Sequence, residues 1–306
     1  MASTGRRIPL EGIFDVNGER DGVPSPKAGS LASRDVGVIR PHRSSLHLIV
    51  GAFCVSLIVL MAALAPWIAP YAPDAIDGAS RLRPPSAEHL FGTDAFGRDL
   101  FSRVVWGSRL ALRLCLITAI VAGLPGILMG LAAGYFRGKV DLVLSRLVDA
   151  WLALPGLLLA LLIIARTGPS LDGTILALGI TGIPGYFRLV RAGAISLSQM
   201  PFVEASRALG AGAGQQIFRH ILPNLTSSIV VLTTLRMGTF LLAGGSLSFI
   251  GLGAQPPEPE WGSLLAEGRD YFDIAWWMFA FPIFAVTCTV LGLNLLGDGL
   301  RDRLAK

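Results

Sequence analysis

The chain has 306 residues, of which 52% are hydrophobic and only 15% are charged, and its formal net charge is +5 at pH 7. Soluble domains average about 25% charged residues, so this composition excludes an ordinary water-soluble protein and predicts a chain that lies largely in lipid. The charged residues are segregated from long apolar runs, so the net positive charge does not by itself indicate a nucleic-acid partner.

The first 45 residues are polar, contain seven lysines and arginines, and have no apolar core. The first apolar run begins near Leu46, and it is too long and too late in the chain for a secretory signal peptide. We therefore expect residues 1–45 to form a flexible cytoplasmic tail in front of a membrane span that is retained.

Six apolar runs have the length that a helix needs to cross a bilayer, about 20 residues. They lie near residues 46–69, 110–134, 144–165, 173–190, 225–252 and 275–297. Because backbone polar groups cannot stay unpaired in lipid, the runs predict an all-α polytopic membrane protein with about six transmembrane helices. Four of the runs contain a proline that can kink its helix, namely Pro125, Pro155, Pro184 and Pro282.

The distribution of basic residues predicts the orientation of these spans. Most of the lysines and arginines lie in the tail, in the connectors 134–147 and 188–224, and in residues 301–306. Cytoplasmic loops are enriched in lysine and arginine, so both termini are expected in the cytoplasm. An even number of spans agrees with that orientation.

Residues 92–99, GTDAFGRD, resemble a phosphate-binding loop only in their glycine spacing. The phosphate motif continues with lysine and then serine or threonine, whereas Arg98 and Asp99 stand at those places, and the Asp99 carboxylate would repel phosphate. The sequence therefore excludes ATP binding at this loop.

The same stretch predicts a helix that lies on the membrane surface and leads into the second span. Thr93 or Asp94 can cap such a helix, and Asp99 and Arg103 are four residues apart and can pair on its polar side. Its apolar stripe would consist of Leu100, Phe101, Val104 and Val105.

Residues 202–224, FVEASRALGAGAGQQIFRHILPN, are too polar for lipid and too regular for a slack connector. Pro201 suits a first helical turn, and Gly210 suits a helix end with a left-handed residue. A second apolar stripe follows before Pro223 and Asn224, which should stop it. The pattern predicts two short helices with a glycine hinge, an element that a partner can grip.

Motifs in this stretch identify a family. Glu204-Ala205-Ser206, then Gly210, then Leu222-Pro223 resemble the EAA loop of bacterial ABC-importer permeases. Ser206 stands in place of the second alanine and His220 where isoleucine is usual, but FRHILPN is typical of the dipeptide/oligopeptide (peptide/nickel/opine) branch. Three other stretches are similar to the C-type permease subunit of that branch: HLFGTDAFGRDLFSRVVWGSR (89–109), LSFIGLGAQPPEPEWGSLLAEGR (247–269) and NLLGDGLRDRL (294–304). The resemblance begins near residue 46 and does not cover the tail.

The resemblance implies a type I ABC-importer permease in the bacterial inner membrane, which forms half of a translocation path. Such a subunit works with a homologous permease, two cytoplasmic ATPase subunits and an extracytoplasmic solute-binding protein. It is not an enzyme and holds no cofactor, since ATP and Mg²⁺ bind to the ATPase partners. Residues 46–109 would hold the first span and the outer loop, and 110–306 the transmembrane domain with coupling helices near 201–224. The residues implied in ATPase coupling are Glu204, Ala205, Ser206, Arg207, Gly210, Leu222 and Pro223.

Several alternatives stay open at the level of sequence. A secondary transporter would need an ionisable relay in mid-span, and Asp149, three residues after Arg146, is the one acid placed inside the bundle. Three scattered cysteines and four scattered histidines form no metal motif.

Di- and oligopeptides are the expected cargo, with nickel, opines, glutathione or oligosaccharides as alternatives. Arg236, in the middle of the fifth span, should face a partner or a wet cavity, where it could meet a substrate carboxylate.

Overall fold

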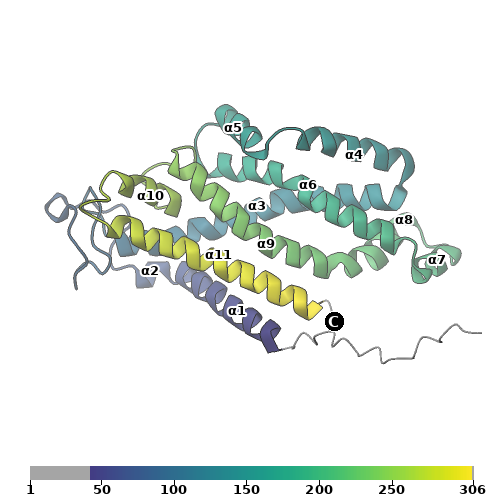
Figure 1. Cartoon of the computed structure of the whole chain (residues 1–306), viewed down its shortest axis with the longest axis horizontal. Coiled ribbons are helices and arrows are strands. Elements are labelled where there is room, and N and C mark those ends of the chain that lie inside the picture. The colour runs from purple at the N-terminus through teal and green to yellow at the C-terminus, as the bar shows by residue number, and fades with distance from the viewer. Residues whose placement is uncertain (1–41, 305–306) are drawn as a thin grey trace, which may run out of the picture. The chain divides into compact units, whose positions relative to one another are not determined.

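The computed structural model describes residues 42–304, and within that range all helices and turns form one helical assembly without strands (Figure 1). The expected tail, residues 1–45, lies outside the described residues except for its last four, which begin the first helix. The helices are α1 (His42–Ala63), α2 (Ala65–Ile68), α3 (Leu100–Phe136), α4 (Gly138–Leu152), α5 (Gly156–Thr167), α6 (Leu171–Leu197), α7 (Pro201–Ala208), α8 (Ala213–Gln215), α9 (Leu222–Phe249), α10 (Trp261–Arg269) and α11 (Trp277–Leu304), with the 3₁₀ turn η1 (Gly78–Ser80) and the π turn η2 (Gln216–Ile221). The predicted all-α fold class is confirmed.

Five described helices are long and apolar enough to cross a membrane, and a sixth span would consist of α4 and α5 together. These two helices are bent by 84° at the break between them, so the run 144–165 is a broken span rather than one helix. Pro155 lies at the N-cap of α5. A proline donates no backbone hydrogen bond and drives the preceding residue out of the helical region, so α4 ends before it and α5 starts in a new direction.

The three other prolines leave their helices continuous. Pro125, Pro184 and Pro282 lie inside α3, α6 and α11. Membrane helices tolerate such prolines because neighbouring helices and small local adjustments satisfy the freed carbonyl groups. The fourth apolar run, which Pro184 interrupts in the sequence, is therefore a regular part of α6.

The surface helix expected at the outer loop is not a separate element. Helix α3 begins at Leu100 and continues without a break to Phe136, so residues 100–109 are the first turns of the second span. Leu100, Val104 and Val105 are buried in the protein core. The predicted apolar stripe does form one face of a helix, but that face packs on protein instead of lipid.

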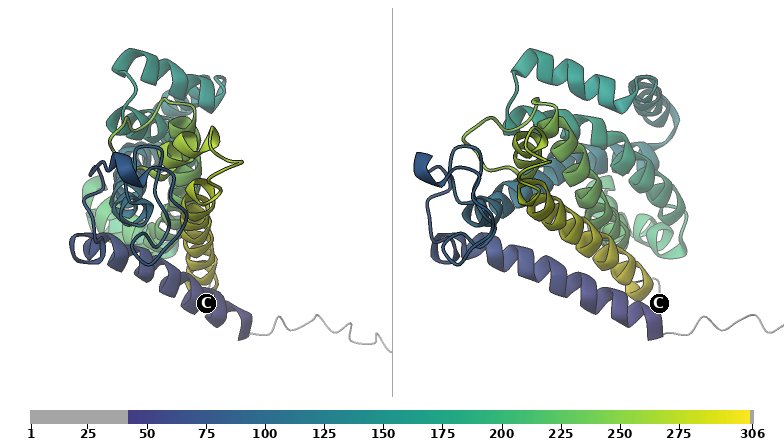
Figure 2. Two further views of the ribbon diagram at one scale, coloured as in Figure 1. Left: turned by 90° about the vertical axis from the view of Figure 1, so that its left-hand side faces the viewer. Right: turned by 60° about the vertical axis from the view of Figure 1, so that its left-hand side comes forward.

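Figure 2 shows the long helices of the bundle from two further sides. Small residues let these helices approach each other closely. A Cβ atom added at Gly126 or Gly134 of α3 would lie 2.7 Å from Tyr186 Cβ or 2.6 Å from Ala194 Cβ of α6. Helix α1 lies along α11 in the same way. Such close contact between backbones is typical of membrane helix bundles, where van der Waals packing replaces the hydrophobic effect.

The helical bundle has two opposite ends (Figure 1). We call the end that carries α7 and residues 209–221 the α7 end, and the opposite end, which carries residues 69–99 and α10, the loop end. Polar side chains gather at both ends, and the two ends are described in turn below.

Candidate functional site

Helix α7 is held to the bundle by one side. It begins at Pro201, a residue that suits a first turn, and Glu204 follows in that turn. Val203 is its buried residue and packs with Ile217 and Ile221 of the π turn. Every other residue of α7 is exposed or half-buried, so the helix presents most of its surface outward.

Gly210 has the left-handed conformation that the sequence predicts, with φ +85°. Its N–H donates to the Arg207 carbonyl at 3.0 Å, and the Ala211 N–H donates to the Ser206 carbonyl at 3.1 Å, so the end of α7 is closed by backbone bonds. An added Cβ at Gly210 would meet no atom within 4 Å. The backbone angle, and not a lack of space, therefore requires glycine at this position.

The second short helix expected after Gly210 is not a separate helix. The chain is helical from Ala213 to Phe249, and the π turn η2 joins α8 to α9. Pro223, which was expected to stop the helix, instead lies in the first turn of α9. The wider π turn before Pro223 accommodates its ring, so the helix continues into the membrane span. The 213–221 segment is thus continuous with α9.

An open groove of about 590 Å³ lies between α7 and the segment that follows it. It is lined by Phe202, Ala205, Ser206, Leu209, Gly210, Ala211, Gln215, Arg219 and His220. Ser206 Oγ lies 3.2 Å from His220 Nε2, within hydrogen-bond distance. These are the two positions where the chain departs from the usual EAA pattern, and the departures meet in one contact across the groove.

The remaining residues implied in coupling lie around this element. Glu204 and Arg207 are exposed and line a second, polar pocket of about 380 Å³ with Tyr135 and Arg137 from the end of α3. Leu222 is half-buried and Pro223 is exposed at the start of α9. The structure thus brings all seven residues to the α7 end, on α7, its hinge and the helix that follows.

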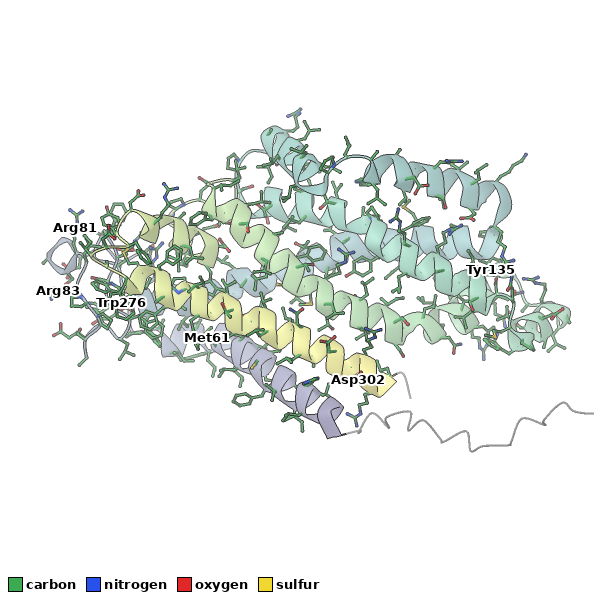
Figure 3. All side chains as sticks on the ribbon, in the orientation of Figure 1. Met61, Arg81, Arg83, Tyr135, Trp276 and Asp302 are labelled. Carbon is green, nitrogen blue, oxygen red and sulfur yellow. The ribbon has the colours of Figure 1, made fainter. Side chains whose placement is uncertain are left out.

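Sequence reasoning missed Gln216, the most deeply buried polar side chain at the α7 end, which is 1% exposed. Its Nε2 donates to the Ala211 carbonyl at 2.7 Å, and its Oε1 accepts from the Tyr135 hydroxyl at 2.9 Å. Figure 3 labels Tyr135 at this end of the bundle. The available signal was a glutamine directly before the buried apolar residue Ile217, at a position that a helix would turn inward.

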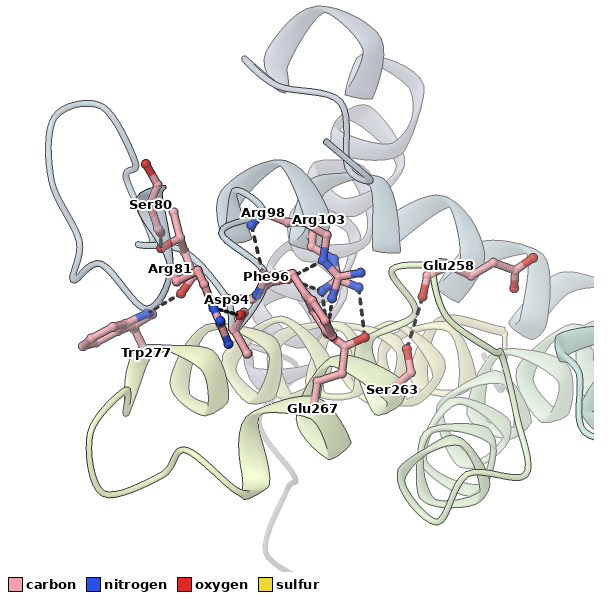
Figure 4. Close-up of polar contacts among 12 residues, drawn as sticks. Ser80, Arg81, Asp94, Phe96, Arg98, Arg103, Glu258, Ser263, Glu267 and Trp277 are labelled. Atoms are coloured by element: carbon pink, nitrogen blue, oxygen red, sulfur yellow. Dashed lines mark hydrogen bonds and ion pairs between the residues drawn. The ribbon is translucent and has the colours of Figure 1, made fainter. Parts of the chain in front are cut away.

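The loop end contains a buried network of four charged side chains (Figure 4). Arg98 Nε and Arg103 Nη1 each lie 2.6 Å from Asp94 Oδ2. Both arginines also reach Glu267 of α10, with distances to Oε2 of 2.7 Å from Arg98 and 2.6 Å from Arg103. Two positive and two negative charges cancel, so the network fastens the loop before α3, and α3 itself, to α10 without a net buried charge.

The expected pairing of Asp99 with Arg103 is wrong. Asp99 instead caps α3, with its Oδ2 accepting from the Ser102 N–H at 2.8 Å, while its Oδ1 lies 2.9 Å from His89 Nδ1. Arg103 turns to Asp94 because the loop folds back on the helix. That fold depends on left-handed backbone at Gly97, where a Cβ would collide with the Asp77 carbonyl.

A third buried acid at the loop end, Glu260, caps α10. The Glu260 side chain accepts from the Ser263 N–H at 3.0 Å and is 1% exposed. Burial raises the pKa of this carboxyl above its usual range, although the hydrogen bonds it accepts oppose the shift.

Arg236 is half-buried in α9 and lies against Gly185 of α6. Its guanidinium is so close to Gly185 that a Cβ there would collide with it. Within residues 42–304, no acidic side chain lies within salt-bridge distance of Arg236. Only 22% of the most apolar stretch of Ala213–Phe249 is buried, against 67% in α6, so α9 carries a large open surface.

Asp149 does not form the buried relay that a secondary transporter would need. Its Oδ1 lies 3.6 Å from Arg188 Nη2 instead of pairing with Arg146, and both partners are more than half exposed. A weak, exposed ion pair of this kind contributes little to stability.

Comparison with known proteins places these features in a group of transport proteins. Residues 126–306 match the model of the binding-protein-dependent transport system inner membrane component, and residues 48–85 match the N-terminal transmembrane domain of oligopeptide transport permease C. The chain is 43% identical to the dipeptide transport system permease protein of Alkalihalophilus pseudofirmus, over 84% of each chain. It is 43% identical to the di/tripeptide permease of Pseudomonas aeruginosa, over 83% of this chain and 86% of the relative. It is 44% identical to the glutathione permease of Shigella dysenteriae, over 83% of this chain and 84% of the relative.

Proposed function

The chain belongs to the family of binding-protein-dependent transport system inner membrane components, and from that premise we propose that it forms half of the translocation path of an ATP-driven importer for di- and oligopeptides. It is a multi-pass inner-membrane protein with five or six spans. The homologous second permease, the two ATPase subunits and the solute-binding protein are partners in this proposal. ATP is hydrolysed by the ATPase partners, and this chain supplies no catalytic residue.

The exposed helix α7 with its left-handed Gly210 is the observation that supports this function most directly. The groove between α7 and η2 carries Arg219 and His220 and has no acidic residue in its lining, so it suits an apolar or acidic surface of an ATPase. Leu209 at its rim is 89% exposed, an arrangement that favours cover by a partner. Because the helix continues from residue 213 into α9, a partner that moves α7 would move a membrane span.

Import by a reconstituted complex tests the proposal. The chain, its sister permease, both ATPases and the binding protein are placed in liposomes, and uptake of a labelled dipeptide is measured with and without ATP. We expect uptake only with ATP and binding protein. Uptake by the permeases alone, driven by a proton gradient, would contradict the proposal and favour a secondary transporter.

Glutathione is the second cargo to be tested, because a relative at 44% identity is named a glutathione permease. Glutathione is a modified tripeptide, so the two cargoes share a carboxylate at the C-terminal end. Competition of unlabelled glutathione against dipeptide uptake distinguishes them, and nickel, an opine and an oligosaccharide serve as further competitors.

Arg236 is proposed to line the path and to meet the substrate carboxylate. A charge inside the membrane must face a partner or a wet cavity, and this guanidinium lies on the helix with the large open surface. A hydrogen bond to a charged group contributes about 1.5–3 kcal/mol. Arg236→Gln should therefore reduce uptake of peptides with a free C-terminus about tenfold or more, and reduce uptake of amidated peptides less.

The matched control is Arg166→Gln, which removes the same charge from an exposed position at the end of α5. It should leave uptake of both peptides unchanged. An equal loss for free and amidated peptides in Arg236→Gln would show that Arg236 has a structural role, such as a contact with the sister permease.

A further inference from the structure

Gln216 connects the hinge after α7 to the end of α3. Its carboxamide donates to the carbonyl of Ala211, the residue directly after Gly210, and accepts from the hydroxyl of Tyr135, at 2.7 Å and 2.9 Å. The side chain is 1% exposed, so both hydrogen bonds are shielded from water. A buried amide with both ends satisfied holds its partners in one arrangement, because breaking either bond leaves an unpaired buried group.

Gln216 lies at the start of the π turn, and a second contact joins the same turn to α7. Ser206 Oγ lies 3.2 Å from His220 Nε2 in the same turn, so α7 touches the π turn directly. Turns of this kind interrupt the regular helical bonding and occur frequently at functional sites. A displacement of α7 therefore reaches Gln216 both through the hinge and through the turn.

Helix α3 can carry such a displacement to the opposite end of the bundle. Its 37 residues correspond to a length of about 55 Å. Tyr135 lies in its last turn, and Arg103 lies in its first turns, where it binds Glu267 of α10. In Figure 3, Tyr135 lies at the α7 end, while Arg81, Arg83 and Trp276 mark the loop end.

We propose that Gln216 and Tyr135 are positioning residues that couple movement of α7 to α3, in addition to the direct connection from α7 to α9. This inference rests on the proposed function, since it assumes that α7 is moved by an ATPase. Through the pair, the hinge, the end of α3 and the start of α9 move together. Without the pair, α9 still follows α7, whereas α3 follows it less closely.

The test compares two variants with one control in the reconstituted complex. Gln216→Leu keeps the buried volume and removes both side-chain hydrogen bonds, and Tyr135→Phe removes the hydroxyl. Tyr135 also lines the polar pocket beside Arg137, so its hydroxyl can bind water when Gln216 is replaced. The control Tyr271→Phe removes a hydroxyl at the loop end that makes no hydrogen bond to another described side chain or backbone group.

The measured quantity is the number of peptides imported per ATP hydrolysed. We expect it to fall about fivefold or more in Gln216→Leu and Tyr135→Phe, while complex yield and ATP hydrolysis stay within about twofold of wild type. The double variant should be no worse than Gln216→Leu alone, because that variant already removes the hydrogen bond that Tyr135→Phe removes. Tyr271→Phe should match the wild type.

An unchanged ratio of import to hydrolysis in Tyr135→Phe would overturn the proposal, even where Gln216→Leu fails to assemble. A parallel loss of import, hydrolysis and complex yield in Tyr135→Phe would also overturn it, because the pair would then only stabilise the fold. Failure of the wild-type complex to import any peptide with ATP would instead contradict the proposed function itself.

Discussion

The four-residue network at the loop end depends on charge balance. Arg103 is fully buried, and its guanidinium is held by Asp94 and Glu267. Removing one member of a buried ion pair costs about 3–5 kcal/mol, because the remaining charge stays buried without compensation. Glu267 is partly reached by water, with a side chain 19% exposed, so its loss should cost less than the loss of Asp94.

Glu267→Gln should lower the melting temperature of the protein in lipid nanodiscs by several degrees, since two arginines then share one carboxylate. Glu258→Gln is the matched control, because Glu258 is an exposed acid just before α10 that forms no ion pair with any residue of 42–304. The two variants should differ clearly in melting temperature. A Glu267→Gln variant as stable as the control would show that the network contributes no net stability.

Glu260 should make stability depend on pH. Burial raises the pKa of this carboxyl in the folded state, so the folded protein holds the proton more tightly than the unfolded chain does. Its contribution to stability is therefore fully present below the unfolded pKa of about 4.3 and is lost as the pH rises through the folded pKa. Glu260→Gln keeps an acceptor for the Ser263 N–H and should flatten the melting temperature across this range. A pH profile identical to that of the wild type would contradict this assignment.

Residue-scale features could be predicted from the sequence only where the partner is close in the chain. The cap role of Asp99 was within reach of the local pattern. Arg103 instead pairs with Asp94 across the folded loop and with Glu267, which is 164 residues away. No local rule connects those two positions. Gln216 was missed for the same reason, since its partner Tyr135 is 81 residues away.

At the scale of elements, the hinge was predictable because left-handed backbone is a local property of glycine. The helix ends were less predictable. Pro223 was expected to stop a helix, but the π turn before it allows α9 to begin without a break. The sequence marks the proline and does not reveal how the preceding turn widens.

Gly210→Val tests the hinge as an element. A β-branched residue with φ near +85° is strained by about 1–2 kcal/mol or more, so the end of α7 should change direction. Gly212→Val is the matched control. Gly212 has φ −68° and ψ 162°, an extended conformation that valine adopts readily. An added Cβ would meet no atom within 4 Å at either glycine, so the two variants differ only in backbone strain.

We expect Gly210→Val to insert normally and then either to lose its ATPase subunits on purification or to hydrolyse ATP without import. Gly212→Val should import peptide as the wild type does. Wild-type import by Gly210→Val would show that residues 202–224 are not the element that transmits movement.

At the scale of the whole molecule, the number and type of spans followed from the sequence because lipid imposes one rule on every span. Each backbone group must be paired within its own helix, so apolar length alone predicts a helix. The bend between α4 and α5 did not follow to the same extent, since Pro155 predicts a kink but not an angle of 84°. The angle depends on packing that the local sequence does not encode, since α4 contacts α3 and α6 while α5 contacts α6.

The orientation of the bundle is the property of the whole molecule that the basic residues predict and that labelling can test. Lys139 is exposed at the start of α4, next to the α7 end, and Asp273 is exposed between α10 and α11 at the loop end. In spheroplasts that express the complete complex, a membrane-impermeant maleimide should label Asp273→Cys and not Lys139→Cys. In inside-out vesicles the pattern should reverse, because the positive-inside rule places the α7 end in the cytoplasm.

The wild-type chain gives the background labelling, since its Cys54, Cys115 and Cys288 all lie inside spans. Labelling of Lys139→Cys in spheroplasts would place α7 outside the cell, out of reach of any ATPase, and would contradict the orientation and the proposed coupling together.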